Sequence, residues 1–189
     1  DWQALDREEL AMVPPVFVLE TAHRVLSNAM SALSILLRSG RPLHLIILDP
    51  SAAMGFAADA AGLAATHPDL GYLAVAHRDA LVLQTSLALP GHLYEGLGAV
   101  AASLRPSVAV VAVPQWTDAV DPWVQLSAAH YGRVTPGFLY DPDGGATWAR
   151  RFELEPNPQS DEPWPRLRVQ AHDDKGALIE RTEPFTFAH

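Results

Sequence analysis

The sequence contains no cysteine, and this absence excludes several kinds of site at once. Disulfide bonds, thiolate zinc sites and iron–sulfur clusters all use cysteine sulfur, so this chain cannot supply it to any of them. A chain without cysteine also suits a reducing compartment, and we therefore expect a cytoplasmic location.

Long apolar runs and concentrations of positive charge are absent as well. No apolar run approaches the roughly 20 residues of a membrane-spanning helix, so we expect no membrane span. The net charge is −9, with 13 basic against 22 acidic residues, and no basic stripe is interleaved with aromatic side chains. Phosphate backbones and anionic membranes repel such a chain, so we expect neither nucleic-acid binding nor membrane attachment.

The motifs of several enzyme classes do not occur. The chain has no Gly-x-Ser-x-Gly nucleophile turn, no Gly-x-Gly-x-x-Gly dinucleotide loop and no Gly-x-x-x-x-Gly-Lys-[Ser/Thr] phosphate loop. Its eight histidines include no His-x-His or His-Glu-x-x-His pair, so we expect them to be solvated or locally hydrogen-bonded rather than metal ligands. These absences disfavour α/β-hydrolases, nucleotide-binding enzymes and histidine-based metal enzymes.

What the chain does contain is a regular alternation of strand-like and helix-like segments. Strands are predicted by apolar runs at residues 13–20, 43–49, 80–86 and 107–114. Helices are predicted at residues 21–38, from residue 67, at 92–103 and at 123–131. Residues 51–66 suit either a helix or an ordered loop. This alternation predicts an α/β domain whose parallel sheet is covered by helices on both faces.

The C-terminal part has a different composition. From Tyr140 onward, the segments YDPDGGATW and EPNPQSDEPWP are rich in Pro, Gly and Asp, as in turns and linkers. The segment RLRVQAHDDKGALIERTE alternates polar and apolar residues about a turn at residues 173–176, which predicts a β-hairpin. We therefore expect an α/β domain over residues 1–158 and a linker with a β-hairpin extension over residues 159–189.

The two ends of the chain suggest that it belongs to a longer polypeptide. It begins with DWQALDREEL, without Met and without the basic and apolar segments of a signal peptide, and it stops at PFTFAH. We interpret it as one piece of a larger protein.

Five segments carry a family resemblance. They are LLRSGRPLHLIILD at residues 36–49, DLGYLAVAHRDALVLQTS at 69–86, LRPSVAVVAVP at 104–114, FLYDP at 138–142 and RFELEPNP at 151–158. In this order they resemble the thiamine-diphosphate domain of the pyruvate:ferredoxin (flavodoxin) oxidoreductases. The resemblance covers residues 16–158 and implies a three-layer αβα sandwich with a mostly parallel sheet, the thiamine-diphosphate-binding fold. It also implies that the parent protein is a 2-oxoacid:acceptor oxidoreductase.

The first cofactor-binding position of that family differs in this chain. The family binds the diphosphate through Mg²⁺, and the Gly-Asp-Gly turn that provides the first carboxylate falls on Thr21, Ala22 and His23. Ala22 offers no oxygen, and the ring nitrogens of His23 are poor ligands for Mg²⁺, which prefers hard oxygen donors. The two turn glycines, which would let the backbone approach the phosphates, are missing too.

The later cofactor positions of the family also differ. After the second strand the family continues to an Asn-Thr-Gly-Gly turn, whereas this chain reads DPSAAMGFAADA. Asp49 remains, but without a metal ion a single carboxylate repels a diphosphate. Gln115 replaces a cysteine that ligates an iron–sulfur cluster in the family. We therefore expect no thiamine diphosphate, magnesium or iron–sulfur cluster in this chain, and leave these groups to other parts of the parent protein.

The sequence leaves two functions open. In the first, the chain is a degenerate thiamine-diphosphate domain with an architectural role: it packs against other domains or subunits, a dimer included, and does not itself catalyse. In the second, the same cleft, lined by Thr21, His23, Asp49 and Ser51, binds or transforms a different small molecule, with His23 and Asp49 as acid and base.

Two features of the sequence also have local explanations. Asp49 lies at the end of a predicted strand, where ligands bind in open α/β folds, but its carboxylate equally suits a cap of the following turn. Trp116 and Trp123 flank the loop QWTDAVDPW, which is either a partner surface or a loop anchored in the core.

Overall fold

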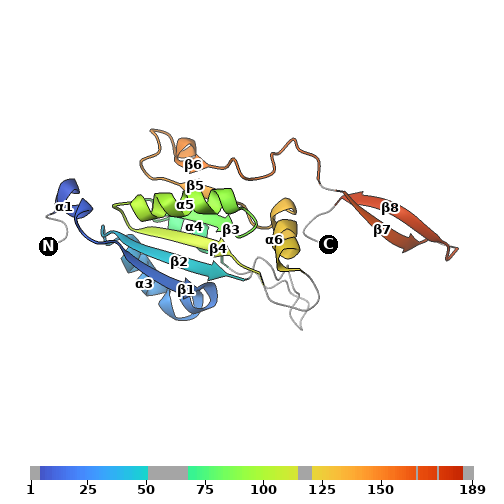
Figure 1. Ribbon diagram of the computed structural model, residues 1–189, viewed down its shortest axis with the longest axis horizontal. Helices are drawn as coiled ribbons and strands as arrows, with labels where there is room; N and C mark the ends of the chain where they lie inside the picture. Colours follow the sequence, from blue (N-terminus) through green and yellow to red (C-terminus); the bar gives the residue numbers. More distant parts are fainter. Residues whose placement is uncertain (1–4, 51–67, 115–120, 165, 174, 185–189) are drawn as a thin grey trace.

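The computed structural model describes residues 5–50, 68–114, 121–164, 166–173 and 175–184. Its centre is a six-stranded sheet with the order β1-β2-β4-β3-β5-β6 (Figure 1). The first four strands in this order run parallel to one another. The strands are β1 (Val16–Thr21), β2 (Leu43–Asp49), β3 (Leu81–Ser86), β4 (Ser107–Ala112), β5 (Phe138–Tyr140) and β6 (Phe152–Glu153). The predicted mixed α/β fold with a mostly parallel sheet is confirmed.

The helices follow the predicted alternation with strands. They are α1 (Arg7–Ala11), α2 (Ala22–Arg24), α3 (Met30–Leu37), α4 (Leu70–Val75), α5 (Pro90–Ala102) and α6 (Pro122–Tyr131), with a 3₁₀ turn η4 (Trp148–Arg151). The helix predicted at residues 21–38 is interrupted by a π-helical turn, η2 (Val25–Ala29), between α2 and α3. It ends as expected near Gly40, whose φ of +65° is a conformation that glycine adopts without strain. Residues 51–66 lie outside the described ranges.

One face of the sheet carries the main core. Leu33 and Leu37 of α3 and Leu70 and Ala74 of α4 pack there against Ile47 and its neighbours on β2, β3 and β4. The members of each parallel pair point to the same side, so Leu45, Val82 and Val108 continue this layer. These side chains are the apolar runs that predicted strands buried in a parallel sheet.

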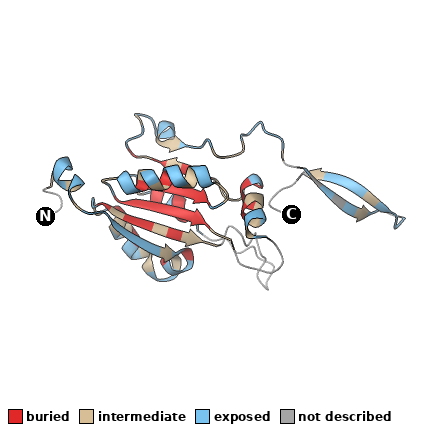
Figure 2. Cartoon of the chain, in the orientation of Figure 1, coloured by how far each residue is buried: buried red, intermediate tan, exposed pale blue. Residues whose placement is uncertain are grey.

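The opposite face is covered over part of its width only. Helix α5 lies across β3 and β4 there, with Val100 packed against Leu83 and Ala109 (Figure 1). Over β1 no described helix takes this role, and Phe17 and Leu19 are 49% and 63% exposed. Figure 2 shows β1 as an exposed strand at the edge of the sheet, whereas β3 and β4 are buried. The expectation of a sheet covered on both faces is therefore wrong for β1.

The sheet continues with two short strands that the sequence did not predict. β5 pairs antiparallel with β3, and β6 pairs antiparallel with β5, within the α/β domain expected over residues 1–158. The Asn157 side chain reinforces this segment, because it both accepts a hydrogen bond from the Gly137 N–H and donates one to the Gly137 carbonyl. Phe138 and Tyr140 are fully buried, so β5 belongs to the core of the domain.

The C-terminal extension is the predicted hairpin. β7 (Arg166–His172) pairs antiparallel with β8 (Leu178–Pro184), and Gly176 in the turn has a φ of +78°. Figure 1 shows the hairpin extending away from the six-stranded sheet. None of the helices in the described part of the chain has the length and apolar character that a membrane span requires.

Candidate functional site

The carboxyl ends of four parallel strands meet at one edge of the sheet. Thr21 ends β1, Asp49 ends β2, Ser86 ends β3 and Ala112 ends β4. Ligands of open α/β proteins usually bind at this edge, so a cleft built from the predicted site residues would open here.

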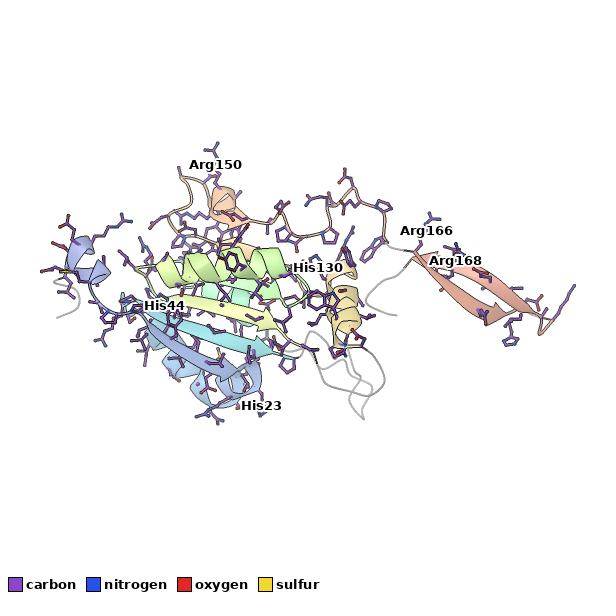
Figure 3. All side chains as sticks on the ribbon, in the orientation of Figure 1. His23, His44, His130, Arg150, Arg166 and Arg168 are labelled. Carbon is purple, nitrogen blue, oxygen red and sulfur yellow. The ribbon has the colours of Figure 1, made fainter. Side chains whose placement is uncertain are left out.

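The residues predicted to line a cleft have local partners or face solvent. Thr21 pairs in register with Leu48, so it lies one residue from Asp49 along the neighbouring strand. Its hydroxyl accepts a hydrogen bond from the Arg24 N–H at 3.4 Å and thus caps α2. The His23 side chain is exposed on α2 (Figure 3). Thr21 and Asp49 therefore end neighbouring strands, but their side chains point to opposite faces of the sheet, and His23 is directed to solvent.

Three predicted positions fall outside the description, and one lies in the core. Ser51, Gln115 and Trp116 belong to residues that the structure does not describe. Ala22, which the sequence resemblance predicted to fall at the family's first metal carboxylate, is 4% exposed and packs in the main core. Across the described residues, no group of three or more histidine, aspartate or glutamate side chains is arranged to hold a metal ion.

A polar cluster that the sequence analysis did not predict lies at the end of β3. Gln84, Thr85 and Ser86 are each buried, although they follow the apolar run of the strand. The Gln84 amide donates to the Asp69 carboxylate at 3.2 Å and to the Pro136 carbonyl at 3.1 Å. Asp69 also accepts a hydrogen bond from a backbone N–H in the first turn of α4 and so caps that helix. The main-core side of β3 thus ends in a structural hydrogen-bond network.

Gly71 makes room for this network. A Cβ atom built on Gly71 would lie 2.0 Å from Gln84 Oε1, which is far inside van der Waals contact. Glycine at this position lets α4 approach the strand closely enough for Asp69 to reach the Gln84 side chain.

On the α5 side of β3, Thr85 is hydrogen-bonded to His92. His92 Nδ1 lies 2.9 Å from Thr85 Oγ1 in a hydrogen bond, and burial lowers the pKa of His92. Glu95 and Glu155 act in the opposite direction on this pKa, and His130 lowers it further. His130 belongs to α6 and is 4% exposed, so of the two expected states, solvated or locally hydrogen-bonded, the solvated one is wrong for this residue.

The signal for this cluster is present in the sequence but weak. Three polar residues, QTS, end an apolar strand, and the following helix begins with PGH. His130 gives no such signal, because only the fold places α6 next to the start of α5.

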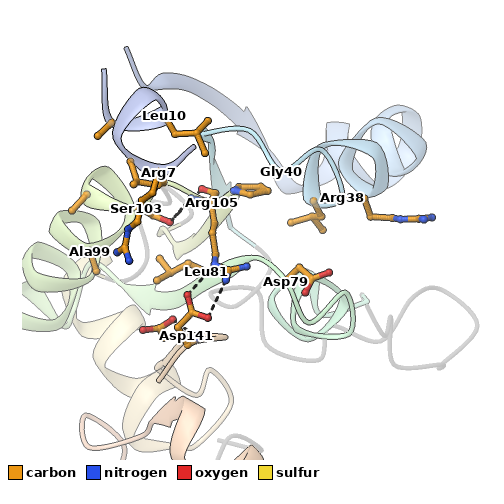
Figure 4. A pocket seen from close by; sticks show the side chains of 16 residues that line it. Arg7, Leu10, Arg38, Gly40, Asp79, Leu81, Ala99, Ser103, Arg105 and Asp141 are labelled. Carbon is orange, nitrogen blue, oxygen red and sulfur yellow. Dashed lines mark hydrogen bonds and ion pairs between the residues drawn. The ribbon is translucent and has the colours of Figure 1, made fainter. Parts of the chain in front are cut away.

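A cavity of about 1000 Å³ lies at the opposite, amino-terminal edge of the sheet (Figure 4). Its wall includes Arg7 of α1, Asp79 and Asp141. Arg105 and Asp143 form a two-point ion pair on this wall, with nitrogen–oxygen distances of 3.0 and 2.9 Å. The lining residues carry charges of both signs, so the cavity does not select a ligand of one charge.

Comparisons with models of known protein families and with curated proteins find no match to this chain.

Proposed function

We propose that this chain is an architectural packing module of a larger protein of the 2-oxoacid:acceptor oxidoreductase type, with a thiamine-diphosphate-type fold that has lost its own cofactor site. The observation that carries the proposal is the exposed apolar strand β1. The family assignment itself is supported by the order of the five sequence segments described above.

The composition of β1 is that of a strand buried on both sides. Val16 and Val18 are 50% and 39% exposed on the α3 side, and Phe17 and Leu19 are exposed on the other. Edge strands of soluble proteins are usually protected by charges, proline or bulges, because exposed apolar edges pair with other chains. An apolar strand with this exposure indicates a surface that another domain or subunit covers.

The carboxyl end of the sheet supports the second part of the proposal, the loss of the cofactor site. A magnesium-bound diphosphate needs carboxylate or amide oxygens, and Ala22 offers only a buried methyl group at the first of these positions. The alternative function, a cleft of Thr21, His23, Asp49 and Ser51 for another small molecule, has less support. The Thr21 hydroxyl is used as a helix cap, and the His23 side chain is exposed.

The association half is tested by sedimentation of the chain. We expect the chain to associate in a concentration-dependent manner and the variant Leu19→Glu to remain monomeric, because a charge on β1 cannot be buried without a partner. Ile35→Glu is the matched control: Ile35 is 71% exposed on α3, which packs on the face of the sheet opposite to Leu19, and its replacement should leave association unchanged. A chain that is monomeric at all concentrations, or equal effects of both variants, would contradict packing through β1.

The cofactor half is tested by titration calorimetry with thiamine diphosphate and Mg²⁺. We expect no heat of binding up to millimolar cofactor. Metal-dependent binding in the micromolar range would overturn the loss of the cofactor site, whatever the result of sedimentation.

A further inference from the structure

The first turn of α5 presents free backbone N–H groups at the carboxyl edge of the sheet. The helix begins at Pro90, which has no N–H, and no side chain in the described part of the molecule caps it. The N–H groups of Gly91 and His92 consequently have no intrahelical acceptor. The helix is 13 residues long, so the positive end of its dipole is fully developed here. A helix start of this kind attracts anions, but other groups are needed to define a site.

The His92 side chain is the second group. Its Nδ1 atom is hydrogen-bonded to Thr85, which is 3% exposed, and this bond fixes the imidazole ring. Its Nε2 atom is buried and has no hydrogen-bond partner among the residues described. Rotation of the ring would leave the Thr85 hydroxyl unpaired, at a cost of about 1–3 kcal/mol. The free nitrogen is thus held in one position next to the helix start.

His130 of α6 provides an independent observation. The residue is only 4% exposed, yet its Nδ1 atom also has no partner within the described ranges. Figure 3 shows His130 on the side of α6 that faces α5, and its charge acts on His92. Buried polar atoms are rarely left unpaired. Two free imidazole nitrogens from neighbouring helices therefore indicate a group that bridges them.

We propose that the start of α5, His92 and His130 form a binding site, called the histidine site below, for a small oxyanion such as a carboxylate or a phosphate. The backbone N–H groups of α5 and the two imidazole nitrogens are the donors that such a ligand requires. A group of carboxylate and histidine side chains would instead suit a metal ion. No group of three or more such side chains that could hold a metal ion occurs among the described residues.

The charges around His92 determine how binding responds to pH. Glu95 of α5 and Glu155 of the segment after β6 raise the pKa of His92, while burial and His130 of α6 lower it. Both glutamates are exposed, so solvent screens their repulsion of a bound anion. An anion at Nε2 favours the imidazolium form, so binding takes up a proton. Affinity is therefore expected to increase as the pH falls from about 8 to about 6, across the ordinary histidine range.

The test is a nuclear magnetic resonance titration of the whole chain with inorganic phosphate and, separately, with acetate, against sodium chloride at equal ionic strength. We expect saturable shifts of the His92 and His130 ring signals with at least one anion, and tighter binding at about pH 6 than at about pH 8. Shifts with phosphate alone indicate a phosphate ligand, and shifts with acetate indicate a carboxylate. Shifts that match those in sodium chloride would overturn the proposal.

Two variants locate the site. His92→Gln is expected to weaken binding about tenfold, the effect of one lost charge-assisted hydrogen bond. His23→Gln, which removes an exposed histidine from α2, should leave binding unchanged. Unchanged affinity in a folded His92→Gln protein would refute the histidine site. Where that variant does not fold, the saturable shift of the His92 signal in the unaltered chain decides the question.

Discussion

His44 Nδ1 and Ser107 Oγ are hydrogen-bonded at 2.7 Å on neighbouring parallel strands, and both residues are fully buried. The Phe17 ring of β1 packs against the imidazole, with 4.9 Å between the ring centroids. Burial disfavours the charged form of the imidazole and so lowers the pKa of His44. One polar pair inside the sheet thus makes the fold sensitive to acid.

We expect the free energy of unfolding to decrease as the pH falls below about 6.5, the ordinary histidine pKa. Because the folded-state pKa of His44 is lowered, the unfolded chain binds the proton more tightly. The contribution of His44 to stability is then fully present above the pKa of the unfolded state and is lost as the pH falls toward the pKa of the folded state. The slope is at most about 1.4 kcal/mol per pH unit for each such group. His92 contributes in the same direction. Urea unfolding at a series of pH values measures the slope.

The matched variants for this prediction are His44→Gln and His23→Gln. The first should flatten the pH dependence, since glutamine does not titrate, and the second should leave it unchanged because His23 is exposed. An unaltered slope in His44→Gln would show that other groups cause the acid sensitivity.

Gly96 and Gly98 of α5 should respond oppositely to replacement by alanine. A Cβ atom on Gly96 would lie 2.4 Å from Leu83 Cδ1, whereas one on Gly98 would meet no atom within 4 Å. We expect Gly96→Ala to destabilise the protein by about 1–3 kcal/mol through overpacking. Gly98→Ala should stabilise it by about 0.5–1 kcal/mol through helix propensity. Thermal unfolding of both variants tests this difference in sign, and equal shifts would contradict the close packing of α5 on β3.

Asp69→Ala should cost more than the loss of a helix cap alone. The carboxylate caps α4 and also accepts a hydrogen bond from the buried Gln84 amide, so we expect a loss of about 2–3 kcal/mol. Asp121 is an exposed cap of α6 without such a buried partner, and Asp121→Ala should cost about 1 kcal/mol. Denaturant unfolding compares the two, and equal losses would show that the contact with Gln84 contributes nothing.

The fold was predictable where burial alone determines the local structure. The runs LHLIILD and SVAVVA are apolar enough to be buried on both faces, and they form β2 and β4. β5 was not predictable in this way: it has three residues, and its place beside β3 depends on Phe138 and Tyr140 reaching a core formed elsewhere. The open face of β1 was missed because its sequence is that of a covered strand.

The candidate site was predictable to a smaller degree. The strand-end rule pointed to the carboxyl edge, where Thr21 and Asp49 do end neighbouring strands, but it could not show that their side chains point to opposite faces of the sheet. It did not identify the buried polar atoms near β3, because the electrostatic interaction of His92 with His130 depends on where α6 packs. The sequence around a single histidine on a helix has no periodicity that indicates which other helix will lie next to it.

The hairpin of β7 and β8 is expected to unfold independently of the six-stranded sheet. Its strands pair with each other, and its ion pair, Arg168 with Glu180, is internal and exposed. A two-stranded ribbon of this kind is marginally stable in water. Its amide protons are therefore expected to exchange with deuterium far faster than those of β4, and a protease should remove it without lowering the melting temperature of the sheet.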